Sequence, residues 1–338
     1  MSIIKRELYK KIYKIIKDYD EIVLARHIGP DPDAIASQIA LRDSIKIAFP
    51  NKKVYAVGAG VHKFKYLGAL DKEELSELQN ALLIVLDVPN FCRIDGIEDL
   101  EYKAILKIDH HPAEDIIGDV DWTDERMSST CEMIANLIME TKLGLDSRIA
   151  ENLFAGIISD SDRFLLQNTS LETFKTVYEL LNKSHINFIP VYNNLYERSI
   201  VEEKFKAYII NNIKISENSF GFLNVTEEAL KEHNVEASIV SNHANDLYFI
   251  KELLCWMYVV YDERNGIFKA NIRSRGPIVN EIAGKYNGGG HKFASGCRTP
   301  NFKDIENLAK DLDEACKNFI IFYLFPKLCH CNLLFKII

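Results

Sequence analysis

The chain has 338 residues, of which 47% are apolar and 27% are charged. This composition is ordinary for a globular protein, and the length exceeds that of one hydrophobic core, so we expect two domains. The formal net charge of −8 excludes a uniformly basic face that coats long nucleic acid, but it allows a local basic site. The seven cysteines are scattered, which favours a reducing compartment, the cytoplasm, over a disulfide framework.

No stretch of the sequence predicts a membrane segment. Residues 1–20 carry apolar side chains at helical spacing among lysines and acidic residues, which indicates an amphipathic helix and not a signal peptide. Residues 319–338 are mostly apolar, but Pro326, His330 and the lysines make them a poor membrane span. We therefore expect no membrane partner, and the role of this apolar tail stays open.

The first predicted strand leads into a turn that carries ligand-type side chains. The apolar run 21–26 is followed by His27, Asp31 and Asp33, and residues 34–47 have helical spacing. Strand, turn and helix in this order are typical of a ligand-binding turn in an open α/β sheet. Asp33 alone has a structural alternative, because an aspartate at the start of a helix often caps it.

Two further predicted strands end in the same kinds of side chain. A nearly pure apolar run, typical of a parallel sheet, ends in Asp87. The apolar run 104–106 leads into Asp109, His110 and His111. Because ligands collect at the carboxyl ends of parallel strands, we expect these side chains to gather at one edge of the sheet.

A predicted helix over residues 151–159 ends in the acidic residues Asp160 and Asp162. Negative charge at a helix C-terminus opposes the helix macrodipole, and a bound cation would offset that cost. Before an earlier predicted helix, Ser129 or Thr130 is interpreted as an N-cap and not as a catalytic hydroxyl.

A second α/β pattern begins near residue 213. Between residues 262 and 303 there are eight Lys and Arg against three Asp and Glu, so this region is locally cationic. Three successive glycines there predict a turn whose N–H groups can approach an anion, and an arginine can clamp a phosphate. A flexible loop without a ligand is the alternative. The candidate substrate-binding residues are Arg273, Ser274, Gly288, Gly289, Gly290 and His291.

The ligand-type side chains of the first domain are carboxylates and imidazoles, without a thiolate. Such a set favours Mn²⁺ or Mg²⁺ over structural zinc, and it is too large for one ion. Two ions that share a bridging carboxylate, about 3.5–4 Å apart, suit hydrolysis of a phosphate ester. The members of the set are His27, Asp31, Asp33, Asp87, His110, His111 and Asp160.

The order of these motifs resembles a known family. The four N-terminal motifs of the DHH phosphoesterases correspond here to His27-x-x-Pro30-Asp31-x-Asp33, Asp87, Asp109-His110-His111 and Asp160. Arg273-Ser274 and residues 288–291 resemble the DHH-associated C-terminal domain. The resemblance covers residues from about 20 to about 318, and within the family the chain looks like the short NrnA-type branch.

This resemblance implies an α/β protein of two domains. The N-terminal domain would have a mostly parallel sheet with helices on both faces, and the C-terminal α/β domain would be smaller. The expected parts are a DHH catalytic domain at 1–185, a helical linker at 186–213, a DHH-associated substrate-binding domain at 214–318 and the apolar tail at 319–338.

The resemblance also implies a role for each site residue. Two Mn²⁺ ions, with Mg²⁺ or Co²⁺ as alternatives, would be held by His27 and Asp31 on one side, by Asp33, His110 and Asp160 on the other, and by Asp87 as the bridge. His111 would face the substrate phosphate and assist proton transfer, and Asp109 would orient the imidazoles. Arg273 and the loop 288–291 would grip a terminal phosphate or base. Asp162 and Asn287 stand where the family usually has glycine.

The implied reaction is metal-dependent hydrolysis of short oligoribonucleotides (nanoRNA) to mononucleotides, together with removal of the 3′-phosphate of 3′-phosphoadenosine 5′-phosphate (pAp). One alternative is a phosphodiesterase for linear or cyclic dinucleotides such as pApA and c-di-AMP. Another is a non-enzymatic RNA-binding protein that uses only the second domain. We expect short RNA or small nucleotides as partners, no long duplex nucleic acid, and leave a homodimer open.

Overall fold

The computed structural model describes residues 3–60, 62–72, 75–97, 101–112 and 115–324. The chain divides into two compact units, Met1–Glu197 and Arg198–Ile338, and each unit is described by itself. Most of the predicted apolar tail, residues 325–338, lies outside the described residues.

A mostly parallel sheet forms the centre of the first unit. Its strand order is β2-β1-β3-β5-β6, all parallel, and the short β4 pairs antiparallel with β1. Each predicted strand here is observed, because runs of apolar residues bury both faces of a parallel strand. The strands are β1 (Glu21–His27), β2 (Lys53–Ala56), β3 (Leu82–Leu86), β4 (Ile94–Asp95), β5 (Ala104–Asp109) and β6 (Val120–Thr123).

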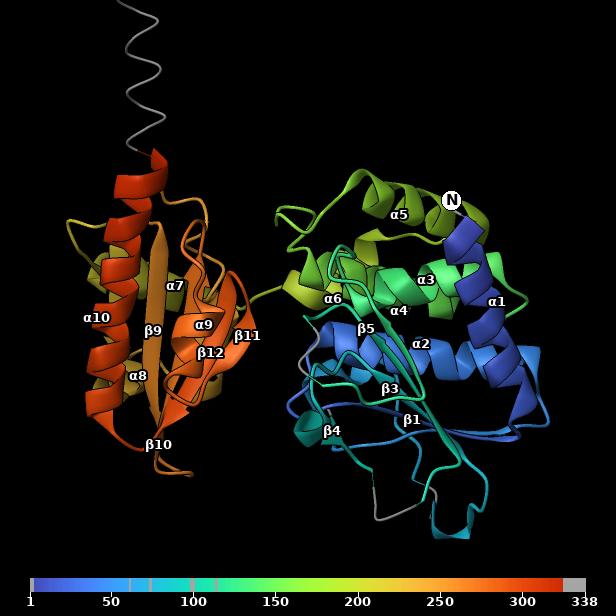
Figure 1. Cartoon of the computed structure of the whole chain (residues 1–338). Helices are drawn as coiled ribbons and strands as arrows, with labels where there is room; N and C mark the ends of the chain where they lie inside the picture. The colour runs from blue at the N-terminus through green and yellow to red at the C-terminus, as the bar shows by residue number, and fades with distance from the viewer. Residues whose placement is uncertain (1–2, 61, 73–74, 98–100, 113–114, 325–338) are drawn as a thin grey trace, which may run out of the picture. The chain divides into compact units, whose positions relative to one another are not determined.

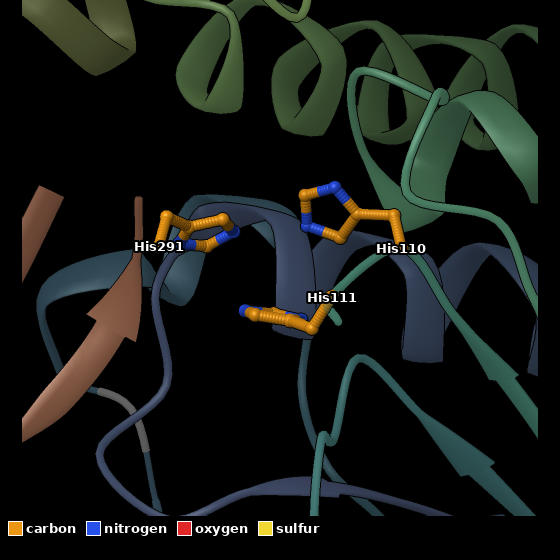
Figure 2. A group of neighbouring side chains, drawn as sticks. All are labelled: His110, His111 and His291. Atoms are coloured by element: carbon orange, nitrogen blue, oxygen red, sulfur yellow. The ribbon is translucent and has the colours of Figure 1, made fainter. Parts of the chain in front are cut away.

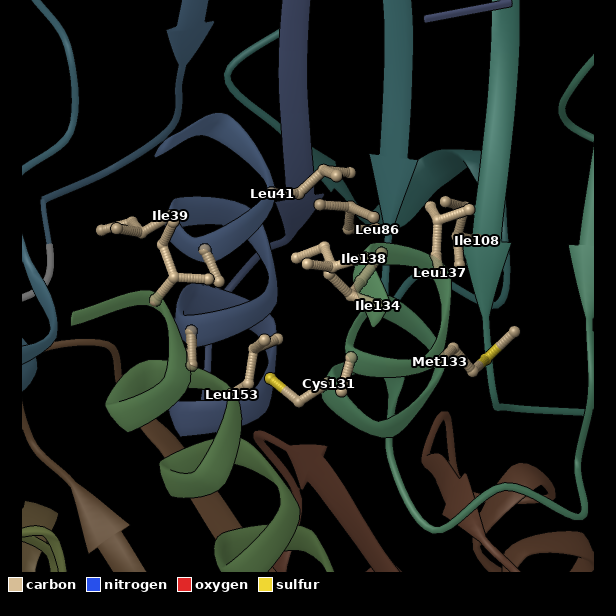
Figure 3. Close-up of a cluster of buried hydrophobic side chains, with 14 of the residues drawn as sticks. Ile39, Leu41, Leu86, Ile108, Cys131, Met133, Ile134, Leu137, Ile138 and Leu153 are labelled. Carbon is tan, nitrogen blue, oxygen red and sulfur yellow. The ribbon is translucent and has the colours of Figure 1, made fainter. Parts of the chain in front are cut away.

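The two faces of this sheet are covered differently. The α-helices pack on one face, which Figure 1 shows above the strands, and the close-up in Figure 3 shows Leu86 and Ile108 of the sheet meeting side chains of α2, α3 and α4. The other face is covered by loops and by the 3₁₀ helix η2 (Leu75–Glu77). The α-helices are α1 (Ile3–Asp18), α2 (Pro32–Ala48), α3 (Thr130–Glu140), α4 (Ser147–Asp160), α5 (Leu171–Ser184) and α6 (Ile189–Tyr196).

Two further 3₁₀ helices, η1 (His62–Leu67) and η3 (Phe91–Arg93), follow β2 and β3.

Ser129 is the N-cap of α3 and accepts a hydrogen bond from the Glu132 N–H, as the sequence predicted for Ser129 or Thr130. The predicted α/β class with two domains is therefore confirmed. The predicted helices on both faces of the first sheet are wrong for the described residues, because the second face is covered by loops and by the 3₁₀ helix η2.

The second unit is a mixed sheet between two layers of helix. Its strand order is β11-β12-β10-β9-β8-β7, and only the β8–β9 pair is parallel. The helices α9 and α10 pack on one face, and α7 with η4 packs on the other. The elements are α7 (Ile200–Asn212), β7 (Lys214–Ile215), β8 (Phe220–Val225), α8 (Glu227–Glu232), η4 (Ala237–His243), β9 (Cys255–Asp262), β10 (Ile267–Ser274), α9 (Asn280–Gly284), β11 (Gly289–His291), β12 (Ala294–Thr299), α10 (Phe302–Phe319) and η5 (Ile320–Leu324).

The residues between the two sheets divide between the two cores. Val191 of α6 packs into the core of the first unit, whereas Phe205 and Ile209 of α7 pack into the second. Within the part of the chain that is described, no helix is both long enough and apolar enough to cross a membrane.

Replacing Ile84 with alanine is expected to lower the free energy of unfolding of the first unit by about 2–5 kcal/mol. Ile84 is fully buried in β3, so the truncation leaves a cavity against α2. The control Ile47→Ala removes the same atoms from a side chain that is 48% exposed, and its effect should stay within about 0.5 kcal/mol. Urea unfolding followed by Trp122 fluorescence, in a Trp256→Phe background, measures the stability of both variants. An equal loss of stability in the two variants would contradict the placement of Ile84 in the buried core.

Candidate active site

The predicted ligand-type residues of the first unit converge at the carboxyl ends of β1, β3 and β5. These strands are neighbours in the sheet, so their last residues lie side by side. His27 ends β1, Asp87 follows β3, and His110 follows β5. All three are buried, with Asp87 only 1% exposed. Adjacent parallel strands therefore bring together residues that are far apart in the sequence.

Asp87 belongs to three groups of potential metal ligands, one of them with Asp109 and His111. The two ligand groups that hold the other motifs are His27, Asp31 and Asp87, and Asp33, Asp87 and His110; in each, the ligand atoms lie within 4.8 Å of one another. The two oxygens of Asp87 face different groups. Oδ2 lies 3.5 Å from His27 Nε2, and Oδ1 lies 3.4 Å from His110 Nε2. Asp87 therefore lies between the imidazoles of His27 and His110 and joins the two ligand groups.

The backbone at Asp87 is unusual. Its φ is +61°, in the left-handed region that a residue with a Cβ seldom adopts. Such strain persists only when the surroundings hold the residue in place, and it concentrates at functional sites.

The turn after β1 places its two aspartates differently. Asp31, not Asp33, is the N-cap of α2, and its Oδ1 accepts a hydrogen bond from the Ala34 N–H. Pro32 occupies the first helical position, and its fixed φ favours a helix that starts there, directly after Asp31. Asp33 is fully buried and accepts hydrogen bonds from the Thr130 and Cys131 N–H groups, at 2.8 and 2.9 Å. The capping alternative for Asp33 is thus wrong.

Asp160 joins the group from the end of α4. Its Oδ2 lies 3.1 Å from His110 Nε2. After Asp160 the backbone makes a left-handed turn in which Asp162, Arg163 and Phe164 all have positive φ, between 43° and 68°. Glycine would adopt this conformation without strain, which explains physically why the residue type expected at position 162 is glycine. Asp162 instead accepts a hydrogen bond from Arg163, at 2.7 Å.

Asp109 and His111 form a hydrogen-bonded pair next to Asp87. His111 Nδ1 lies 2.8 Å from Asp109 Oδ1 and 3.4 Å from Asp87 Oδ1. Lys107, fully buried on the same face of β5, lies 3.4 Å from Asp109 Oδ2 and supplies a positive charge. Figure 2 shows the rings of His110 and His111, whose centroids are 4.7 Å apart; His291, drawn with them, belongs to the second unit.

The buried charges of this cluster act on one another strongly. Burial raises the pKa of Asp33 well above its usual value, and the charges of Asp87 and Asp160 raise it further. Burial opposes a charge on His110, but the hydrogen bond and charge of Asp160, followed by Asp87 and Asp33, raise the pKa of that imidazole well above its usual value. Divalent cations would replace these protons and relieve the repulsion. The donor set, imidazole and carboxylate, therefore fits ions such as Mn²⁺.

The predicted substrate-binding residues lie in the second unit. Arg273 and Ser274 end β10. Arg273 Nε donates to Asn245 Oδ1 at 2.6 Å, and its Nη1 donates to the Ile272 carbonyl at 2.9 Å. Ser274 Oγ donates to the Pro277 carbonyl at 2.7 Å. The guanidinium of Arg273 is thus oriented by its own unit.

The glycine turn predicted at residues 288–290 is wrong as secondary structure. Residues Gly289–His291 form strand β11, which pairs with β12, Gly289 opposite Gly296. A Cβ on Gly288 would lie 2.4 Å from the carbonyl oxygen of Gly296, and Gly290 has a φ of +130°. Glycine is needed here because two strands approach closely, which a turn preference cannot reveal.

Sequence reasoning missed two residues of the first-unit cluster. Thr130, treated as a cap candidate, donates a hydrogen bond from its Oγ1 to Asp87 Oδ1, at 3.0 Å. Lys107 is the other residue, and a lysine at the end of an apolar run is a signal for a buried ion pair.

Gly288→Ala is expected to lower the free energy of unfolding of the second unit by about 1–3 kcal/mol, because the added methyl group meets backbone atoms that cannot move aside. Gly289→Ala is the matched control, since a Cβ there meets nothing within 4 Å. Trp256 fluorescence during urea unfolding, in a Trp122→Phe background, compares the two. The same stability for both variants would refute the close approach of Gly288, just before β11, to the carbonyl of Gly296 in β12.

Comparison with known proteins assigns both parts of the chain. Residues 21–157 match the N-terminal domain of the DHH family, and residues 218–318 match the DHHA1 domain. The chain is 34% identical over 310 residues to the bifunctional oligoribonuclease and PAP phosphatase NrnA of Bacillus subtilis (strain 168), covering 91% of this chain and 98% of that protein. It is 32% identical to the probable NrnA of Streptococcus mutans, over 91% of this chain and 99% of the other.

A solved structure shares the fold. The crystal structure of an exopolyphosphatase-related protein from Bacteroides fragilis aligns with a TM-score of 0.76 at 21% identity, covering 91% of this chain and 97% of that one. The two domain matches and the near full-length relatives show that the chain belongs to the DHH family of phosphoesterases, hydrolases that act on phosphoester bonds.

Proposed function

We propose that this protein hydrolyses short oligoribonucleotides to mononucleotides and removes the 3′-phosphate of pAp. The reaction would use two divalent metal ions, of which Mn²⁺ is the preferred one. The relatives from B. subtilis and S. mutans are named for these two activities. The observation that carries the proposal is the position of Asp87, whose two oxygens face two separate groups of imidazole and carboxylate ligands.

The residues that would hold the ions follow from these groups. His27, Asp31 and Asp87 would hold one ion, and Asp33, Asp87 and His110 the other, with Asp160 beside His110. When bound, two such ions supply a hydroxide near neutral pH and neutralise charge on the phosphoryl oxygens. Asp31, with a side chain 49% exposed, lies on the solvent side, where a substrate can enter.

His111 is the proposed proton donor to the leaving oxygen. Asp109 accepts a hydrogen bond from His111 Nδ1, which places the transferable proton on Nε2. Burial opposes a charge on Asp109, but the hydrogen bond and charge of His111 lower the pKa of this carboxyl below its usual value, so that Asp109 can orient the ring and stabilise an imidazolium. The distribution of roles matches that of a general acid whose orientation is held by a carboxylate.

The second unit would supply substrate binding through Arg273, Ser274, Gly288 and strand β11, which contains Gly289, Gly290 and His291. The Arg273 guanidinium is already oriented by Asn245, so little freedom is lost when it clamps a phosphate. We also propose a cytoplasmic location, because the described cysteines are free thiols: Cys92, Cys131, Cys255, Cys297 and Cys316.

Asp87→Asn is expected to lower kcat/KM on a labelled short RNA by at least about 100-fold, because the bridge between the two ligand groups loses its charge. Asp43→Asn is the control: this aspartate pairs with Arg42 on α2 and belongs to neither ligand group. Chelation of divalent metal should abolish turnover by the wild type, and added Mn²⁺ should restore it.

The same assay separates the alternatives when its substrates are short RNA, pAp, pApA and c-di-AMP. Higher kcat/KM on the dinucleotides than on RNA and pAp would favour the dinucleotide phosphodiesterase. Binding of short RNA without metal, with no turnover and no effect of Asp87→Asn, would favour the RNA-binding protein and sink the proposal.

A further inference from the structure

The first turn of α3 lies directly against two of the carboxylates. Asp33 uses both oxygens to accept hydrogen bonds from α3: Oδ2 from the Thr130 N–H and Oδ1 from the Cys131 N–H. The first N–H groups of a helix have no partner within the helix and carry a partial positive charge. A buried carboxylate in this place is therefore both fixed in position and stabilised as an anion.

Thr130 makes a second contact from the same turn, through its side chain. Its Oγ1 donates to Asp87 Oδ1 at 3.0 Å, and both residues are buried. Thr130 thus reaches Asp33 through its backbone and Asp87 through its hydroxyl. Thr130 therefore contacts a carboxylate from each of two motifs, the turn after β1 and the end of β3, although it belongs to neither motif.

The turn itself is held in place by a buried network. Glu132 Oε2 accepts hydrogen bonds from the Ser128 N–H and hydroxyl, at 2.9 and 2.7 Å, and from Thr173 Oγ1 of α5, at 3.0 Å. Glu132, Ser128 and Thr173 are each fully buried. The start of α3 is consequently tied to the start of α5 and cannot move away from the carboxylates without breaking this network.

We propose that Thr130 is a positioning residue for the two-metal centre, and that its hydroxyl fixes the bridging carboxylate of Asp87 in the orientation that serves both ions. The proposal rests on the proposed metal-dependent function. Without the hydroxyl, Asp87 Oδ1 loses its 3.0 Å hydrogen bond and is left with the imidazole nitrogens of His110 and His111, each 3.4 Å away, so its carboxylate can rotate more freely. Because Asp87 belongs to both ligand groups, the affinity for both ions would fall together.

The test uses Thr130→Val, which keeps the shape and removes the hydroxyl, and Thr130→Ser, which restores the hydroxyl. Titration calorimetry of metal-free protein with Mn²⁺ alone measures affinity and stoichiometry. We expect Thr130→Val to weaken both binding events by about 10–100-fold, and Thr130→Ser to bind like the wild type. Asp31→Asn, which alters one ligand group only, should weaken one event.

Thr176→Val is the matched control, because it removes a buried hydroxyl of α5 that bonds Asn136 and not the cluster. Its Mn²⁺ affinity should equal that of the wild type. The melting temperature in metal-free buffer should be similar for Thr130→Val and Thr176→Val, while the rise on adding Mn²⁺ should shrink only for Thr130→Val. A Thr130→Val protein that binds Mn²⁺ as tightly as the wild type would overturn this inference and leave the proposed function intact; a wild type that binds no Mn²⁺ would overturn both.

Discussion

The crowding of buried carboxylates around Asp87 is the constraint on which the rest of this structure depends. Asp33, Asp87 and Asp160 lie close to the same imidazole, His110, and each raises its pKa. A buried group of like charges is unstable unless a cation or protons offset it. The repulsion between these carboxylates is located at the carboxyl ends of the parallel strands, where such sheets bind ligands. A metal-dependent hydrolase accounts for this arrangement, because bound cations would offset the charge.

The scaffold around this cluster fixes each carboxylate separately. Asp31 caps α2, Asp33 meets the start of α3, and Asp109 pairs with the buried Lys107. Two of these contacts are local to β5 and to the start of α2, whereas the contact of Asp33 with α3 joins elements that are far apart in the sequence. Ligands held in advance lose little conformational freedom when an ion binds, and this preorganisation favours affinity.

Much of the first unit was predictable because its signals are local. Apolar runs predicted β1, β3 and β5, and the side chains that follow them predicted the ligand groups. The capping alternative for Asp33 was wrong: Asp31 and Asp33 both stand near the start of α2, but Asp31 caps this helix and Asp33 contacts α3. The predicted glycine turn was wrong because three glycines permit a turn, whereas Gly289 and Gly290 pair with Gly296 and Ser295 of β12.

The sequence by itself determined the fold class, the family and the chemical type of the site, because residue periodicity and ordered motifs are written along the chain. The tertiary structure alone decided which oxygen of Asp87 faces which imidazole and that Thr130 reaches Asp33 across 97 residues of sequence. Those contacts depend on how strands and helices are stacked. No local preference of Asp33, Asp87 or Thr130 specifies such stacking, which results from burial of the apolar faces of the whole unit.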